Sequence, residues 1–142
     1  MFLIEHHGKE LLASHGIPVP AGVFVPAGSD VLAHRPPDGS LMVKAQVASG
    51  GRGKAGGIES AASHGDIARI VATLDGRSLN GKPIHGFRIE QRVDFAHEAY
   101  VSLSIDGATG EVTGYVDLAM ERAYVYRDNA PSEIVELPAS MT

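Results

Sequence analysis

The sequence predicts an α/β (α+β) fold in which mixed sheets are flanked by helices and two strands form an antiparallel hairpin. Apolar residues recur at helical spacing in two segments, and they alternate with polar residues in several others. Two of the alternating segments are joined by the turn sequence DGATG, which predicts the hairpin. With 142 residues, 44% of them apolar, and no linker-like stretch, the chain is expected to form one soluble domain with a sizeable core.

The first expected element is a short amphipathic helix over residues 2–15. Ile4, Leu11 and Leu12 lie at helical spacing, and Gly16 follows as a stop signal. The helix is therefore expected to pack one apolar face against the rest of the fold.

Two further helices are expected. One is brief, within residues 29–35, because a Pro-Pro-Asp-Gly turn follows it directly. The other is the clearest helix of the chain: Asp66 is the expected N-cap and Gly76 the stop signal. Its buried face is predicted to consist of Ile67, Ile70, Val71 and Leu74.

The expected strands are short segments with alternating apolar and polar residues. Pro20 restricts the first of them to the edge of a sheet, because proline cannot donate a ladder hydrogen bond. These segments are residues 19–25, 41–47, 87–93 and 134–137, together with the hairpin of residues 98–105 and 111–119.

The composition excludes several classes of function. Asp and Glu number 17 against 12 Lys and Arg, so the net charge of -5 argues against broad binding to nucleic acid or to an anionic membrane. There is no cysteine, which excludes disulfides and thiolate chemistry, and the seven histidines lack the spacing of a metal site. Because no stretch has the length of a signal peptide core or a membrane span, the chain is expected to be cytoplasmic.

The most informative stretch is glycine-rich, VKAQVASGGRGKAGGI at residues 43–58, and it contains no acidic residue. It formally fits G-x-G-x-x-G, but the next helix starts too late for a dinucleotide-binding loop. It is not a Walker loop either, since Ala55 follows Lys54 where Ser or Thr is required. What remains is a connection between two extended segments whose backbone N–H groups can approach phosphate oxygens. A solvated turn is the alternative for such a loop.

Lys44 lies on the strand that precedes this loop, with Arg52 within it. A lysine on the solvent face of a strand is commonly only a surface residue. Next to a loop suited to phosphate, however, Lys44 would be a good partner for a phosphate, and Arg52 and Lys54 would add charge-assisted donors to a polyphosphate.

Three segments, HHGKELLASHGIPVPAG, VKAQVASGGRGKAGG and IEQRVDFAHEAYVS, resemble the amino-terminal part of the ATP-grasp domain of ADP-forming acyl-CoA synthetases, typified by the succinyl-CoA synthetase β subunit. The resemblance implies a partial ATP-grasp fold that holds ATP between two lobes. It places Lys44 and the Gly-Arg-Gly segment at the phosphates, Glu90 and the backbone of Val93 beside the adenine, and a second carboxylate at the ribose. The residues that the resemblance assigns to the nucleotide are Lys44, Gly51, Arg52, Gly53, Glu90, Val93 and Glu98.

The resemblance also implies a reaction and partners. The full-length protein would form an acyl-CoA from a small carboxylic acid, CoA and ATP, together with an α subunit. The Mg²⁺ ligands and the CoA-ligase domain would lie outside residues 1–142, so the isolated chain is expected to be inactive. The alternative is a non-catalytic half-domain that binds a nucleotide or a partner without turnover.

Overall fold

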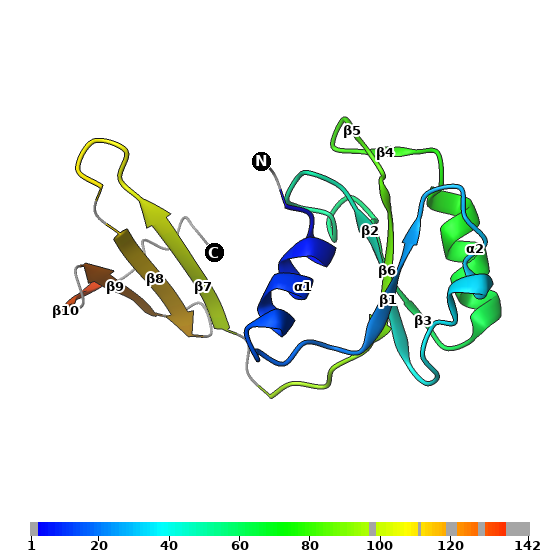
Figure 1. Ribbon diagram of the computed structural model, residues 1–142, viewed down its shortest axis with the longest axis horizontal. Helices are drawn as coiled ribbons and strands as arrows, with labels where there is room; N and C mark the ends of the chain where they lie inside the picture. The colour runs from blue at the N-terminus through cyan, green and yellow to red at the C-terminus, as the bar shows by residue number, and fades with distance from the viewer. Residues whose placement is uncertain (1–2, 97–98, 111, 119–121, 128–129, 136–142) are drawn as a thin grey trace. The chain divides into compact units, whose positions relative to one another are not determined.

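The computed structural model describes residues 3–96, 99–110, 112–118, 122–127 and 130–135. It divides the chain into two compact units, Met1–Val93 and Asp94–Thr142, each of which is described by itself. The sequence carries no linker signal at this boundary. Figure 1 labels the helices and strands of both units.

The first unit is built on a four-stranded antiparallel sheet in the order β1-β6-β2-β3. A two-stranded ribbon, β4 with β5, stands beside it. The elements of this unit are α1 (Glu5–Ser14), β1 (Gly22–Pro26), the 3₁₀ helix η1 (Leu32–His34), β2 (Leu41–Gln46), β3 (Ile58–Ala61), α2 (His64–Leu74), β4 (Ser78–Leu79), β5 (Lys82–Pro83) and β6 (Gly86–Gln91).

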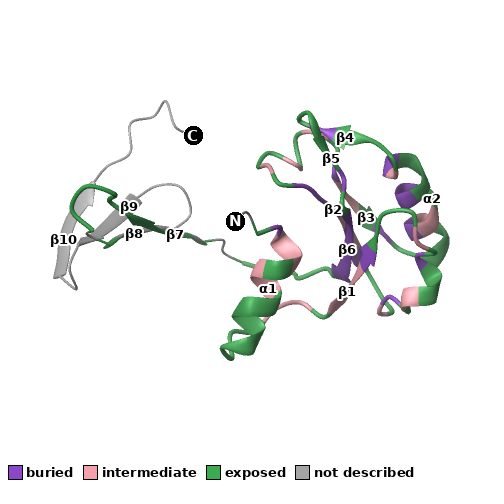
Figure 2. Cartoon of the chain, turned by 45° about the horizontal axis from the view of Figure 1, so that its top comes forward, coloured by how far each residue is buried: buried purple, intermediate pink, exposed green. Residues whose placement is uncertain are grey.

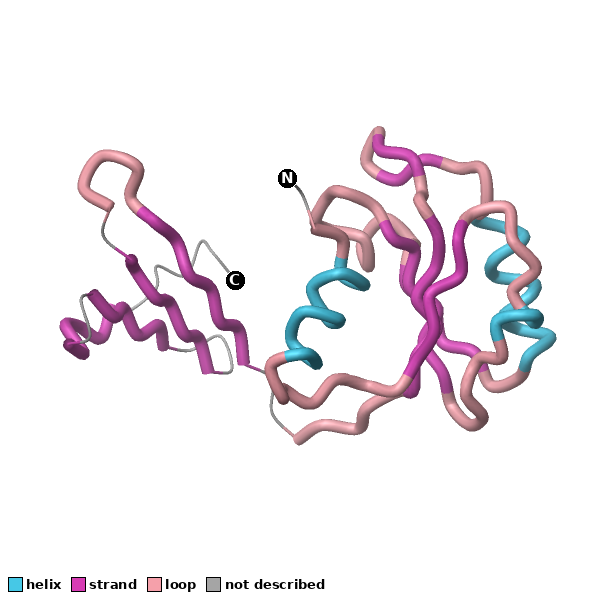
Figure 3. The backbone as a smooth tube through the Cα atoms, in the orientation of Figure 1, coloured by secondary structure: helices cyan, strands magenta, loops and turns pink. Residues whose placement is uncertain are grey.

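The two helices cover opposite faces of this sheet, as the tube in Figure 3 shows. The core lies on the α2 face, where Leu41, Val43, Phe87 and Ile89 are fully or almost fully buried. On α2 the predicted apolar face is confirmed, since Ile67, Ile70, Val71 and Leu74 are all buried. The burial colours in Figure 2 show this concentration of buried residues in the sheet and along α2.

The predicted N-cap of α2 is wrong. Ser63 is the N-cap, and its hydroxyl oxygen accepts a hydrogen bond from the backbone N–H of Asp66 at 3.1 Å. Asp66 lies three residues further on, where its carboxylate accepts a hydrogen bond from the Ser63 hydroxyl at 2.9 Å. The Ser63 hydroxyl thus caps the helix and is itself held by Asp66, and an acidic residue in the first turn complements the helix dipole.

The first helix also differs from its prediction. α1 forms within the expected segment, but none of its own residues is buried, and Leu11 and Leu12 are exposed. Ile4, the residue before it, is buried. The helix is therefore not attached to the sheet by an apolar face of its own.

Most of the strands of the first unit form where the sequence predicted them. β1 lies at the edge of the sheet as Pro20 predicted, and β2 and β6 form where residues 41–47 and 87–93 predicted them. The alternating pattern did not predict β3 or the short β4–β5 ribbon.

The second unit is a four-stranded antiparallel sheet in the order β10-β9-β8-β7. The predicted hairpin is present as β7 and β8, paired from Ala99 with Leu118 to Ile105 with Val112. The last predicted strand overlaps β10 at Ile134 and Val135, and its remaining residues lie outside the described part. The bounds are β7 (Ala99–Ile105), β8 (Val112–Leu118), β9 (Arg122–Arg127) and β10 (Ala130–Val135).

Candidate anion site

The candidate site lies on the α1 face of the first sheet. Side chains alternate between the two faces of a strand, so Lys44 points away from the core that its neighbours Val43 and Ala45 enter. On the adjacent strand β6, Arg88 and Glu90 occupy the same face as Lys44, because Lys44 pairs with Arg88 in the register. A cluster of charged side chains therefore collects under α1.

Glu90 is at the centre of this cluster. Its carboxylate lies 2.6 Å from the Lys9 ammonium, 2.7 Å from the Lys44 ammonium and 3.0 Å from Nε of Arg88. The Glu90 side chain is only 2% exposed. A buried carboxylate needs such partners, because burial without them would be costly.

A second carboxylate, that of Glu5, joins α1 to the glycine-rich loop. Its oxygens lie 2.8 Å from the Lys9 ammonium, 3.3 Å from the Lys44 ammonium and 2.6 Å from Nη2 of Arg52. Nη1 of Arg52 donates to the carbonyl of Ala45 at 3.0 Å. Four cations, Lys9, Lys44, Arg52 and Arg88, thus surround two carboxylates, and we call these six side chains the charge cluster.

The charge cluster is positively charged in a chain whose formal net charge is -5. Four fixed cations against two carboxylates leave two positive charges without a counterion inside the charge cluster. Such a local excess attracts an anion even when the whole protein is acidic.

The ionisation of the charge cluster follows from its contacts. Burial raises the pKa of Glu5, but the hydrogen bonds and charges of Lys9, Lys44 and Arg52 outweigh this and lower the pKa to about 2. Burial likewise opposes the ionisation of Glu90, and its three cations hold its pKa below the usual value. Burial lowers the pKa of Lys44, whereas its hydrogen bond to Glu90 and the Glu5 charge raise it, with a net increase. All three groups are charged at neutral pH.

Polar contacts also hold the first turn of α1. The backbone N–H of His6 donates to Oε1 of Gln46 at 2.9 Å, and Gln46 is fully buried. The His6 ring stacks on Phe24 at 4.4 Å between ring centres. Burial lowers the pKa of His6. The charge of Glu10 opposes this effect, and the charge of Arg88 adds to it.

The glycine-rich loop joins β2 to β3 and so connects two extended segments, as the sequence predicted. The two strands form an antiparallel pair, which was not predicted. It folds back on itself, since the Gly57 N–H donates to the Arg52 carbonyl at 2.8 Å. Gly51 has a φ of +72°, a conformation that residues with a Cβ rarely adopt. Within the described part of the chain, the backbone N–H groups of residues 50–53 donate to no other residue. These amides are available to an anion beside the charge cluster.

The structure therefore brings three predicted residues, Lys44, Arg52 and Glu90, into one charge cluster, with Gly51 and Gly53 in the adjoining loop. Val93 lies two residues beyond β6 and is 53% exposed. Glu98 lies outside the described residues.

Sequence reasoning missed Glu5, Lys9 and Arg88. Glu5 and Lys9 form an i,i+4 pair on α1, a spacing that is visible in the sequence. Arg88 stands two residues before Glu90 and so shares its strand face. Neither spacing shows that all three residues converge on one place, because that depends on how α1 packs on the sheet.

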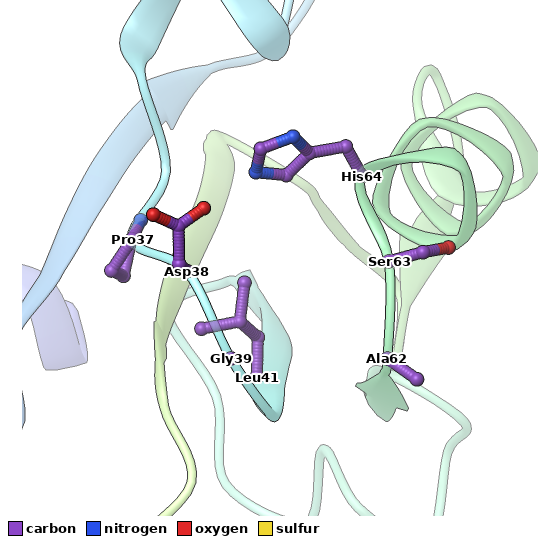
Figure 4. Close-up of a pocket in the computed structure, with 7 residues that line it drawn as sticks. All are labelled: Pro37, Asp38, Gly39, Leu41, Ala62, Ser63 and His64. Atoms are coloured by element: carbon purple, nitrogen blue, oxygen red, sulfur yellow. The ribbon is translucent and has the colours of Figure 1, made fainter.

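A separate hollow of about 200 Å³ lies on the other side of the unit, between the turn before β2 and the start of α2. Figure 4 shows the Asp38 carboxylate and the His64 ring facing each other across it. Both residues are exposed, and none of the predicted site residues lines this hollow.

The described residues contain neither a metal site nor a membrane-spanning helix. Among them, no group of three or more His, Asp or Glu side chains is placed to hold a metal ion. No helix in that part of the chain has both the length and the apolar character needed to cross a membrane.

Comparison with known proteins gives a consistent result. Residues 2–116 match the family model described as the ATP-grasp domain. The chain is 32% identical over 146 residues to the succinate–CoA ligase [ADP-forming] subunit beta of Aquifex aeolicus, covering 96% of this chain and 38% of that protein. It is 38% identical over 115 residues to the "probable malate–CoA ligase subunit beta" of Mesorhizobium japonicum, covering 75% of this chain and 29% of that protein. The chain thus spans well under half the length of these relatives.

Proposed function

Because the chain belongs to the ATP-grasp domain family, we propose that it is the ATP-binding part of an ADP-forming acid–CoA ligase. The observation that carries the proposal is the surplus of positive charge in the charge cluster, next to a loop whose N–H groups at residues 50–53 donate to no other described residue. A nucleotide polyphosphate supplies the negative charge and the acceptor oxygens that such a site needs.

In this proposal the chain positions the phosphates and neutralises their charge. Lys44, fixed on a strand, acts as a point charge, and Arg52 offers its planar fork to phosphate oxygens. The amides of Gly51 and Gly53 add backbone donors. ATP, when bound, supplies the phosphoryl group, and these residues hold it in place without covalent chemistry.

The remaining predicted contacts concern the nucleoside. By family likeness, the Glu90 region and the backbone of Val93 lie beside the adenine, and Glu98 accepts hydrogen bonds from the ribose hydroxyls. In the structure the Glu90 side chain already has three cationic partners. We therefore assign its carboxylate to holding Lys44 and Arg88 in place, and assign the adenine contact to the backbone of the strand end.

The described residues do not fit a Mg²⁺ site. Among these residues, the two carboxylates of the charge cluster are both paired with cations, and no other group of acidic side chains is assembled to hold a metal ion. By family likeness, the Mg²⁺ ligands are expected outside residues 1–142.

The whole protein, in the proposal, works with an α subunit to join a small carboxylic acid to CoA. Its relatives are named as β subunits of such ligases, and the chain spans only part of them. The second candidate is a half-domain that binds a nucleotide or a partner without turnover, which the lack of an assembled metal site among the described residues favours for residues 1–142 alone.

Calorimetric titration tests the binding proposal. The chain is expected to bind ADP or ATP in the high-micromolar to millimolar range, on the order of -4 to -6 kcal/mol, and NAD hardly at all. Tighter binding of NAD than of ADP would overturn the proposal, and undetectable binding of either nucleotide would favour a partner-binding half-domain.

A coupled ADP-release assay tests the reaction. Residues 1–142 alone are expected to be silent, whereas the full-length protein with its α subunit should release ADP when Mg²⁺, CoA and succinate or malate are all present. If the full-length protein with its α subunit releases no ADP with any short carboxylic acid, the ligase assignment is wrong. Acid- and CoA-dependent turnover by residues 1–142 alone would show that the catalytic groups have been misplaced.

A further inference from the structure

Glu5 occupies the cations that a phosphate would need. Its carboxylate holds Nη2 of Arg52 at 2.6 Å and the Lys44 ammonium at 3.3 Å. We propose that Glu5 is an internal competitor of the nucleotide: its carboxylate stands in for a phosphate group and must release Arg52 and Lys44 before a polyphosphate can bind. This inference rests on the proposed function and adds a residue that regulates the same site.

Carboxylate and phosphate oxygens compete for the same donors. Both accept short charge-assisted hydrogen bonds from a guanidinium or an ammonium group, and the fork of Arg52 suits either of them. Because Nη1 of Arg52 is already bonded to the Ala45 carbonyl, Nη2 is the donor that Glu5 and a phosphate would contest.

The two carboxylates of the charge cluster have different roles in this scheme. Glu90 belongs to a central strand, is 2% exposed, and lies 2.7 Å from Lys44. Glu5 is the first residue of α1, is 19% exposed, and lies at the longer distance of 3.3 Å from Lys44. Glu90 therefore fixes Lys44 in place, and Glu5 is the partner that can be exchanged.

The exchange has a consequence for α1. Since none of the residues of α1 is buried, its first turn depends on polar contacts such as those of Glu5 and His6. A ligand that takes Arg52 and Lys44 removes two of the three cations from Glu5 and leaves Lys9. The two events are therefore coupled, and the coupling is reciprocal: a phosphate ligand loosens the first turn, and removal of the Glu5 charge favours the ligand.

The test compares Glu5→Gln with Glu10→Gln. Both substitutions remove one negative charge from α1, but Glu10 is 63% exposed and its ion pair is with His6, outside the charge cluster. By titration calorimetry, Glu5→Gln should bind ADP and pyrophosphate about tenfold more tightly than the wild-type chain, because the competing charge is gone. Glu10→Gln should bind them as the wild type does.

The outcomes separate this inference from the proposed function. Measurable ADP binding by the wild-type chain, with equal or weaker binding by Glu5→Gln, would refute the competitor role and leave the nucleotide site intact. An equal gain in Glu10→Gln would refute it as well, because the effect would then be one of net charge. Lack of ADP and pyrophosphate binding by all three chains would refute both the site and the competitor.

A second measurement needs no substitution, which guards against a variant that fails to fold. Amide hydrogen exchange of the wild-type chain should show the first turn of α1 exchanging severalfold faster in saturating pyrophosphate, while the amides of α2 keep their rates. Unchanged or slower exchange in the first turn of α1 would overturn the proposal.

Discussion

Lys44 and Arg88 lie directly opposite each other on β2 and β6, so two cations share one cross-strand position in the middle of the sheet. Like charges at such a pair destabilise the strands unless a counterion lies between them. Glu90 supplies it, at 2.7 Å from Lys44 and 3.0 Å from Arg88. The sheet and the candidate site therefore depend on the same carboxylate.

Glu90→Gln tests this dependence. Removing the buried charge leaves three cations close together, so the free energy of unfolding of the first unit should fall by about 3–5 kcal/mol in urea denaturation. Glu59→Gln is the control, because Glu59 lies on β3 and has no ion pair among the described residues. A Glu90→Gln chain as stable as the control would mean that the sheet does not need this carboxylate.

Lys44→Met tests the phosphate role. Loss of a charge-assisted contact of roughly 1.5–3 kcal/mol should weaken ADP binding about ten- to hundredfold in the complete protein. The fold should survive, since Glu90 keeps Lys9 and Arg88.

Lys82→Met is the matched control for this variant. Lys82 is an exposed cation of β5, outside the glycine-rich loop, and has no ion pair among the described residues, so its loss should change ADP binding little. An unfolded Lys44→Met chain by circular dichroism would show that Lys44 is structural and leave its phosphate role unsupported.

Acid should weaken the first unit through Glu5. The pKa of the Glu5 carboxyl is about 2 in the folded chain, below its ordinary value of 4.5. The folded state therefore binds a proton at Glu5 less readily than the unfolded state does. The stability from Glu5, about 3 kcal/mol by linkage, is thus fully present above pH about 4.5 and is lost as the pH falls towards 2. Glu90 contributes in the same direction.

Urea denaturation at several pH values measures this loss. The stability difference between wild type and Glu5→Gln should shrink as the pH falls from about 5 to 2. A difference that stays constant over this range would contradict the ion-pair origin of the Glu5 contribution.

Ser63→Ala should destabilise the start of α2. The Ser63 hydroxyl accepts from the Asp66 N–H at 3.1 Å, and loss of such a cap costs about 1 kcal/mol. Ser60→Ala on β3, whose side chain is exposed, is expected to change the urea midpoint much less. Equal effects of the two substitutions would argue that the cap contributes nothing.

The elements that the sequence predicted best are those with a one-sided apolar pattern. The buried face of α2 and the burial alternation of β2 follow from local periodicity, because each segment packs on the core with one face. The same reasoning failed for α1, whose Leu11 and Leu12 are exposed while its charged residues contact the sheet. Periodicity detects apolar packing and gives no sign of a helix held by ion pairs.

The site was predictable only in part for a related reason. Lys44 and Arg52 carry local signals, namely a strand, a glycine-rich loop and a lack of acidic neighbours. The contacts of Lys9 with Glu90 and of Glu5 with Arg52 join residues that are far apart in the chain, and no local pattern encodes them. The N-cap was missed because Ser63 and Asp66 are both favourable cap residues, and only the backbone path distinguishes them.

The pairing of β2 with β6 determines when the charge cluster can assemble during folding. Lys9 and Glu90, which meet at 2.6 Å, are 81 positions apart, and β6 pairs with β1 and β2 only across long intervening segments of the chain. Contacts of such high sequence separation form late in folding, after the entropy of loop closure has been overcome. During synthesis the cations near the amino terminus therefore leave the ribosome without their central counterion, and they remain solvated until residue 90 emerges and β6 inserts between β1 and β2.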